Sequence, residues 1–286
     1  MRVLSTPADR VFRLQRLGGQ HRHAGDLDGA ERLYRRALAL AERALPPDDV
    51  ATARVRINLG VVLKYTGAFR DAAALYERAH AVLAATLGPE HPEVATVLHN
   101  IGGLAHAAGR PADGEHAARR AVTIREASPG ADHPDTAADR AALAAILDAL
   151  GRHDEATELL EGALAVFERT LGPDHHEVAV TLANLGAIDA RRGDLNSAER
   201  RRRRALAIKE HTLGEDHVEL VPTLGTLGVV CRRAGDLDAS RGHYERALRL
   251  LETRRLDAHP QATTLRANLA RLDCREVRDD GEARRR

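Results

Sequence analysis

Apolar residues recur along most of the chain with the spacing of an amphipathic helix, and polar turns separate these segments. One such segment carries Val94, Val97, Leu98, Ile101 and Leu104. Pro92 suits the first position of this helix, where its missing N–H costs no hydrogen bond. Gly109 is predicted to end the helix in the left-handed conformation that glycine tolerates. A second apolar segment begins near residue 112, so the pattern predicts two helices joined by a short turn.

This helix pair returns every 42 residues along the chain. The turn glycine is repeated as Gly25, Gly67, Gly109, Gly151, Gly193 and Gly235. The repeat predicts six helical hairpins, over residues 7–48, 49–90, 91–132, 133–174, 175–216 and 217–258. A last helix over 260–276 is predicted to cap them, and the polar tail over 277–286 is predicted to be disordered.

Small residues occupy two further fixed positions of the repeat. The second helices carry an alanine column, Ala37, Ala79, Ala121, Ala163, Ala205 and Ala247. The first helices carry a glycine or alanine column, Gly60, Gly102, Ala144, Gly186, Gly228 and Ala270. Such positions let helices approach closely, and a hairpin with such a face cannot bury it alone. We therefore expect the hairpins to stack as one all-α solenoid, a single domain over residues 1–276.

The residues Asn58-Leu59-Gly60, Gly67, Ala72, Tyr76 and Ala79 resemble the tetratricopeptide repeat (TPR), whose usual period is about 34 residues. The longer period, with the segments ALAIKEHTLGEDH and LGPEHPEVATVLHN, is similar to the kinesin-light-chain type of repeat. The resemblance implies a right-handed TPR superhelix with a concave inner surface. It also implies a non-catalytic scaffold for protein–protein interaction.

Three hairpins depart from the family pattern at the position of Tyr76, where they carry Ala118, Leu160 and Arg202. Arg202 belongs to a run of five arginines, Arg200–Arg204. Side chains of five consecutive helical residues point in all directions, so at least one arginine is expected at the edge of the core. We expect this hairpin either to be locally looser or to need an acidic neighbour.

Composition narrows the class of protein only a little. The 43 Lys and Arg residues nearly balance the 42 Asp and Glu residues, so the formal net charge of +1 gives no overall attraction to nucleic acid or membranes. Almost all basic residues are arginines, which is typical of a GC-rich bacterial genome. Cys231 and Cys274 are too few for a disulfide framework, and no signal peptide or membrane span is recognisable. A cytoplasmic protein is therefore expected.

A histidine column could suggest a metal site, through His91, His133, His175, His217 and His259. However, packed helices lie roughly 10 Å apart, whereas ligands of one zinc ion lie about 2 Å from it. We therefore predict helix capping or another structural role, with no metal site. Cys231 lies in an apolar stretch and is predicted to be a core residue. Because no nucleophile–base pair or phosphate-binding glycine motif is recognisable, neither enzymatic activity nor a cofactor is predicted.

An asparagine column is the first candidate for ligand binding, and it comprises Asn58, Asn100, Asn184 and Asn268. The resemblance implies that this position faces the concave groove and that its amide binds the backbone of an extended peptide. An amide can do so because it offers both a donor and an acceptor. The alternative is that these residues bond neighbouring repeats and only fix the stack. Ala142 and Thr226 interrupt the column, so weaker contact is expected in repeats four and six.

A basic column lies beside the asparagines and comprises Arg191, Arg233 and Arg275, with Arg232, Arg271 and Lys64 nearby. Basic side chains at repeat spacing would create a positive potential in a groove and favour an acidic peptide partner. The alternative is that they are simply solvated. A regulator acting through a separate effector chain is a second hypothesis. Nucleic-acid binding through Arg200–Arg204 and Arg284–Arg286 is a third, which the neutral charge and scarce aromatics disfavour. The sequence does not indicate the oligomeric state.

Overall fold

The computed structural model describes residues 6–253 and 260–283, and the side chains of 6–253 and 261–272. Within those ranges the regular structure is entirely helical. The helices are α1 (Pro7–His23), α2 (Leu27–Ala44), α3 (Val50–Tyr65), α4 (Phe69–Leu87), α5 (Pro92–Ala107), α6 (Pro111–Arg125), α7 (Pro134–Ala149), α8 (His153–Leu171), α9 (His176–Arg192), α10 (Leu195–Leu213), α11 (Val221–Ala234), α12 (Leu237–Thr253) and α13 (Pro260–Ala283). Two short helical turns, η1 (Glu126–Gly130) and η2 (Val218–Leu220), precede α7 and α11.

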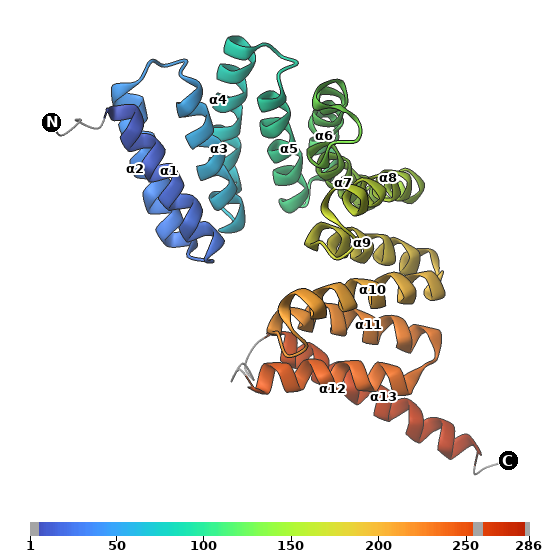
Figure 1. Cartoon of the computed structure of the whole chain (residues 1–286). Helices are drawn as coiled ribbons and strands as arrows, with labels where there is room; N and C mark the ends of the chain where they lie inside the picture. The colour runs from blue at the N-terminus through green and yellow to red at the C-terminus, as the bar shows by residue number, and fades with distance from the viewer. Residues whose placement is uncertain (1–5, 254–259, 284–286) are drawn as a thin grey trace. The chain divides into compact units, whose positions relative to one another are not determined.

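Each predicted 42-residue repeat contains one pair of helices, which confirms the all-α TPR solenoid as the fold class (Figure 1). The C-terminal helix differs from the prediction. α13 continues to Ala283, past the predicted end at residue 276, so the segment expected to be disordered is helical that far. The prediction of disorder rested on the polar composition of residues 277–286. Polar residues can continue a helix, because Arg, Glu and Ala are good helix formers and this segment contains no proline. Residues 284–286 lie outside the described residues.

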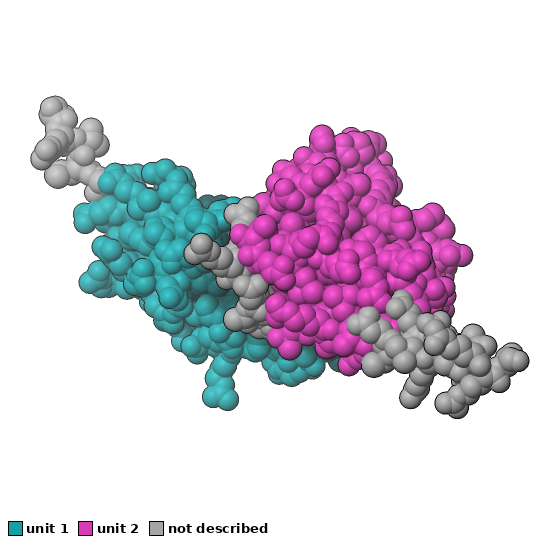
Figure 2. All heavy atoms as spheres, turned by 90° about the horizontal axis from the view of Figure 1, so that it is seen from below, with its two compact units in different colours: residues 1–159 teal, residues 160–286 magenta. Residues whose placement is uncertain are grey.

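The chain divides into two compact units, residues 1–159 (unit 1) and 160–286 (unit 2), which Figure 2 colours separately. In unit 1, α3 contacts both α1 and α5, and α5 also contacts α7. We call these four the first-helix layer of unit 1. In unit 2, α11 and α13 are likewise in contact. The single solenoid domain expected over residues 1–276 stays a prediction.

The turns between the helices follow the predicted chemistry. The six turn glycines all have positive φ, between 71° at Gly109 and 89° at Gly235, as their predicted left-handed role requires. The histidine column caps the next helix in four repeats, at His91, His133, His175 and His217. In each of them Nδ1 accepts the backbone N–H two residues on, at 3.1–3.3 Å. The predicted capping role is therefore confirmed for these four. His259 lies outside the described residues.

Candidate functional site

The first-helix layer of unit 1 contains a cavity of about 270 Å³. It is lined by Gln15 of α1, by Arg54, Ile57 and Asn58 of α3, and by Glu93 and Thr96 of α5. The Asn58 amide nitrogen donates a hydrogen bond to Gln15 Oε1 at 3.0 Å. Asn58 thus bonds a residue of the neighbouring hairpin and also lines a hollow.

An ion pair bridges the same cavity. Arg54 donates to both carboxylate oxygens of Glu93, with a distance of 2.9 Å from Nε to Oε2. The hydrogen bond from Arg54 holds the pKa of Glu93 below its usual range. Both side chains stay partly exposed, 56% for Arg54 and 27% for Glu93, so solvent weakens their attraction. The pair connects α3 to α5.

Lys64 of α3 lies in the same layer, and no acidic side chain among the described residues pairs with it. Its ammonium lies 5.2 Å from the centroid of the exposed Tyr65 ring. It also covers Gly103 of α5, where a Cβ would lie 3.7 Å from Nζ. Partial burial lowers the pKa of Lys64, because desolvation disfavours the charged form. A carboxylate brought to this position would compensate that cost.

A buried network lies further along the layer. Asp139 of α7 is 3% exposed and accepts a hydrogen bond from Arg125 Nε at 2.7 Å. His99 of α5 lies 2.7 Å from the other carboxylate oxygen, from Nδ1 to Oδ1. Arg125 also donates to Thr96 Oγ1 at 2.8 Å, so the network ties the lining of the cavity to two further helices.

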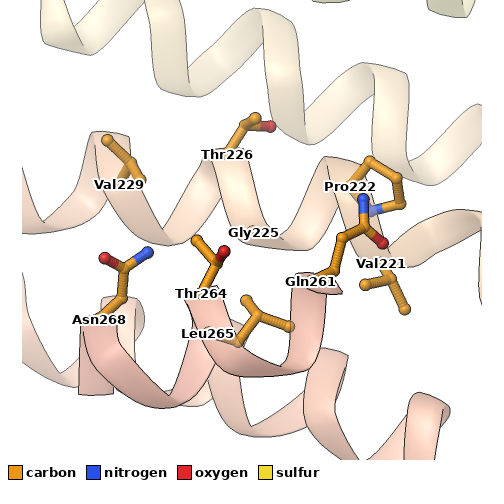
Figure 3. A pocket seen from close by; sticks show the side chains of 9 residues that line it. All are labelled: Val221, Pro222, Gly225, Thr226, Val229, Gln261, Thr264, Leu265 and Asn268. Carbon is orange, nitrogen blue, oxygen red and sulfur yellow. The ribbon is translucent and has the colours of Figure 1, made fainter. Parts of the chain in front are cut away.

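Unit 2 has a second cavity of about 270 Å³, between α11 and α13 (Figure 3). Its lining is Val221, Pro222, Gly225, Thr226 and Val229 of α11, with Gln261, Thr264, Leu265 and Asn268 of α13. Most of these groups are apolar, and the two amides and two hydroxyls are distributed around them. Asn268 Oδ1 accepts a hydrogen bond from Arg271 Nη1 at 3.2 Å. An apolar side chain with polar backbone on both sides matches this lining.

The remaining asparagines lie in different surroundings. Asn100 donates to the Thr96 carbonyl oxygen of its own helix at 2.8 Å, and Asn184 is exposed. Thr226, which interrupts the column, lines the cavity of unit 2 beside Asn268. Only Asn58 and Asn268 of the column therefore line one of these two cavities.

Sequence reasoning missed most of the other lining residues. They share a simple register with the asparagine column. Arg54, Thr96 and Thr264 stand four residues before an asparagine of the column, and Glu93 and Gln261 stand seven residues before one. Four and seven residues correspond to one and two helical turns. Extending the column by two turns towards the N-terminus of each first helix would have found them.

The basic column is exposed where its side chains are described. Arg191, Arg233 and Arg271 are exposed, and Arg232 is half-buried, with its Nε lacking a hydrogen-bond partner. The side chain of Arg275 lies outside the described part of the chain, as does that of Cys274. Cys231 is fully buried, which confirms its predicted place in the core.

The arginine run is largely used within the fold. Arg201 pairs with Glu161 at 2.8 Å, Arg203 with Glu199 at 2.6 Å and Arg204 with Glu168 at 2.6 Å. These three arginines therefore have acidic neighbours, whereas Arg202 at the tyrosine position has no acidic partner among the described residues. Because these guanidiniums already bind carboxylates, the run is a weak candidate for phosphate contacts.

The described residues hold no group of three or more His, Cys, Asp or Glu side chains that is arranged to bind a metal ion. In the same part of the chain, each helix is too short or too polar to span a membrane.

The family comparison covers most of the chain. Residues 10–85, 69–127, 93–161, 140–211 and 184–253 each match the family described as Tetratricopeptide repeat. No curated protein sequence matches the chain significantly.

Solved structures share the same fold at low sequence identity. BtubC (BKLC) from P. vanneervenii has a TM-score of 0.65 and 22% identity, over 87% of this chain and 92% of its own. Nearly identical TPR-like repeats of a kinesin light chain from Podosopora anserina give 0.59 and 23%, over 73% and 99%. A Rap protein complexed with Competence and Sporulation Factor gives 0.66 and 12%, over 96% and 77%. The five matches along the chain and the paired helices agree, and the chain belongs to the tetratricopeptide repeat family.

Proposed function

We propose that this protein is a non-catalytic interaction scaffold whose first helices bind an extended, acidic segment of another protein. The observation that carries the proposal is the pair of cavities between successive first helices. One contains Asn58 and the other Asn268, two members of one sequence column, although the cavities lie in different units. Because an asparagine amide lines both cavities, a ligand with a repeated polar group is favoured. A peptide backbone has such a group in each residue.

The two cavities would bind different kinds of side chain. The cavity of unit 2 has an apolar lining that suits an aliphatic or aromatic side chain. The cavity of unit 1 has charged walls, with the Arg54–Glu93 pair inside it and Lys64 in the same layer. An acidic residue there would pair with Lys64 or Arg54, and a charge-assisted hydrogen bond is about twice as strong as a neutral one.

The relatives with the same fold support a peptide ligand. The Rap protein was solved in complex with Competence and Sporulation Factor. At 12% identity this likeness concerns the fold and transfers no residue to this chain. Support for the acidic character of the segment comes from two side chains of this protein: Lys64, which has no acidic partner within the described part of the chain, and the exposed Arg233.

The proposal is tested by filling the apolar cavity. A Cβ at Gly225 would lie 3.5 Å from Leu265 Cδ2, in ordinary van der Waals contact, so Gly225→Leu should place its side chain in the hollow without breaking the helix. Gly242→Leu is the matched control, because a Cβ at Gly242 has no neighbour within 4 Å. Both variants are assayed on an array of extended peptides that vary in acidic and apolar residues.

The expected result is that Gly225→Leu loses the peptides with apolar anchors while Gly242→Leu keeps them. A triple variant of Asn58, Asn100 and Asn184 to alanine should weaken capture of all peptides, with the largest share due to Asn58. If both the Gly225 variant and the triple variant captured peptides as the wild type does, the proposal that the first helices bind peptides would be wrong. Binding to nucleic acid that falls steeply with salt would instead support the third hypothesis.

A further inference from the structure

A third hollow lies between α1 and α2 and shares no lining residue with the two cavities described above. Its volume is about 380 Å³, and its lining is Arg10, Arg13 and Leu14 of α1 with Arg36, Ala39, Leu40 and Arg43 of α2. Leu14 and Leu40 are half-buried and form an apolar floor, and the four arginines are exposed around it. We call this hollow the basic pocket.

The 42-residue repeat shows what covers the α1 side of this surface one hairpin later. Arg10 and Arg13 stand 42 residues before Thr52 and Val55. Thr52 is 1% exposed and Val55 is fully buried, because the preceding second helix, α2, packs against that side of α3. In the first hairpin the equivalent side of α1 carries arginines, and no described helix covers it.

The contact between α2 and α3 also shows which kind of helix fits such a surface. Ala37 and Ala41 of α2 pack against Val55. One residue further on, Glu42 Oε1 accepts a hydrogen bond from Arg56 Nη2 at 3.1 Å. A helix with small apolar residues on one face and a glutamate at its edge is therefore the natural complement of this side of a first helix.

Charge makes the basic pocket selective. No ion pair or side-chain hydrogen bond joins Arg10, Arg13 or Arg36 to another described residue, and Arg43 donates only to the Ala39 carbonyl oxygen. Arg10 and Arg13 are three residues apart on one helix, where like charges repel. Carboxylates of a partner would relieve this repulsion. The lining has no aromatic side chain on which a nucleobase could stack, which favours protein over nucleic acid.

We propose that the basic pocket binds an acidic amphipathic helix of a partner protein, stacked on the first hairpin as α2 stacks on α3. Its apolar face contacts Leu14, Ala39 and Leu40, and its glutamates pair with the arginines. This site is separate from the peptide-binding cavities and does not depend on them. The alternative is that the arginines only keep copies of the protein from stacking on one another. In that case the basic pocket would bind no such helix.

The test is a fluorescence anisotropy titration of the full chain with a labelled synthetic peptide of about 18 residues, long enough to form a helix. One face of the peptide carries Ala and Leu, and the other carries Glu. A second peptide has every Glu replaced by Gln, and a single-stranded DNA of equal charge is the third probe. The protein variants are Arg10→Gln with Arg36→Gln, Ala39→Phe to fill the hollow, and Arg70→Gln with Arg78→Gln on the exposed side of α4 as a charge-matched control.

The expected result is binding of the Glu peptide that weakens at least about tenfold in the Arg10/Arg36 variant and in Ala39→Phe. The Arg70/Arg78 control should retain wild-type affinity, and Gly225→Leu should too, which separates this site from the groove. Equal loss in both double variants, or equal binding of the Gln peptide, would overturn the proposal. So would DNA binding with the same sensitivity, or self-association of the protein that the Arg10/Arg36 variant abolishes.

Discussion

The ring of Tyr244 lies directly on the backbone of Gly228. A Cβ at Gly228 would come 2.4 Å from Cε1 of that ring, closer than real side chains allow. Tyr76 lies in the same way over Gly60 in the second hairpin. The small column in the first helices and the tyrosine position in the second helices are therefore two halves of one contact. This contact sets the spacing of the two helices in a hairpin.

Gly228→Ala is expected to destabilise the protein by about 1–3 kcal/mol, because the new methyl group forces the buried Tyr244 ring out of place. Gly242→Ala in the partner helix α12 has open space and should stabilise by about 0.5–1 kcal/mol through helix propensity alone. Urea denaturation of both variants measures the difference. Equal changes in the two free energies of unfolding would show that the ring does not fix the spacing.

Arg202 occupies the tyrosine position of the fifth hairpin, where the burial of its guanidinium is not compensated by hydrogen bonds. Its Cγ lies 3.0 Å from a Cβ placed on Gly186, and its Nε is buried without a hydrogen-bond partner. Burial, with a smaller contribution from Arg191, lowers the pKa of the Arg202 guanidinium. The sequence correctly predicted that an arginine of the run would lie at the edge of the core.

Arg202→Leu is therefore expected to stabilise the protein by about 1–2 kcal/mol, because it removes an unsatisfied buried donor. Leucine already fills this position in the fourth hairpin, where Leu160 is 1% exposed. Arg203→Leu is the control and should cost no more than about 0.5 kcal/mol, because Arg203 forms only an exposed pair with Glu199. Thermal and urea denaturation measure both, and a destabilised Arg202→Leu would contradict this account.

The sequence predicted the features that repeat. The turn glycines, the helix pairs and the histidine caps each occupy one position of the 42-residue period, and the structure confirms them. Their physical basis is local, since a left-handed turn or a helix N-terminus depends on neighbouring residues only. Repetition made each local signal visible several times.

Contacts between helices could not be predicted in the same way. The Arg54–Glu93 and Arg201–Glu161 pairs join residues about one repeat apart, and many alternative pairings would have satisfied the same sequence. The two cavities and the basic pocket depend on which faces of neighbouring helices meet. That geometry also explains why Thr226, expected to weaken the groove, lines a cavity.

The Arg54–Glu93 pair should make stability depend on pH in the acidic range. The pKa of Glu93 is lowered in the folded state, chiefly by the hydrogen bond from Arg54, so the folded protein binds fewer protons there than the unfolded chain. The stabilisation is present above the ordinary glutamate pKa of about 4.3 and is lost as the pH falls through the lower folded value. Solvent exposure of both side chains limits it to about 0.5 kcal/mol.

A double-mutant cycle with Arg54→Gln and Glu93→Gln measures this dependence in urea at pH 7 and pH 3. The coupling energy should be favourable at pH 7 and weaker at the lower pH. A coupling that is independent of pH would show that the carboxylate charge does not contribute.

Lys64 links stability to binding. Because burial lowers the pKa of Lys64, the charged form costs the folded protein some stability at every pH below the folded pKa. This cost falls as the pH rises towards the unfolded pKa.

Lys64→Met keeps the length of the side chain and removes the charge. We expect the free energy of unfolding to rise slightly at pH 7, by less than about 1 kcal/mol, while affinity for acidic peptides falls about tenfold. Lys209→Met in α10 is the control for loss of a partly buried lysine charge, because burial lowers the pKa of Lys209 as well and the residue does not line the cavity between α11 and α13. Unlike Lys64, Lys209 donates a hydrogen bond from Nζ to Thr223 Oγ1 at 3.0 Å, so its free energy of unfolding is measured alongside the affinity. Isothermal titration calorimetry with the acidic peptides selected by the array compares the two variants, and an equal loss of affinity in both would mean that Lys64 makes no direct contact.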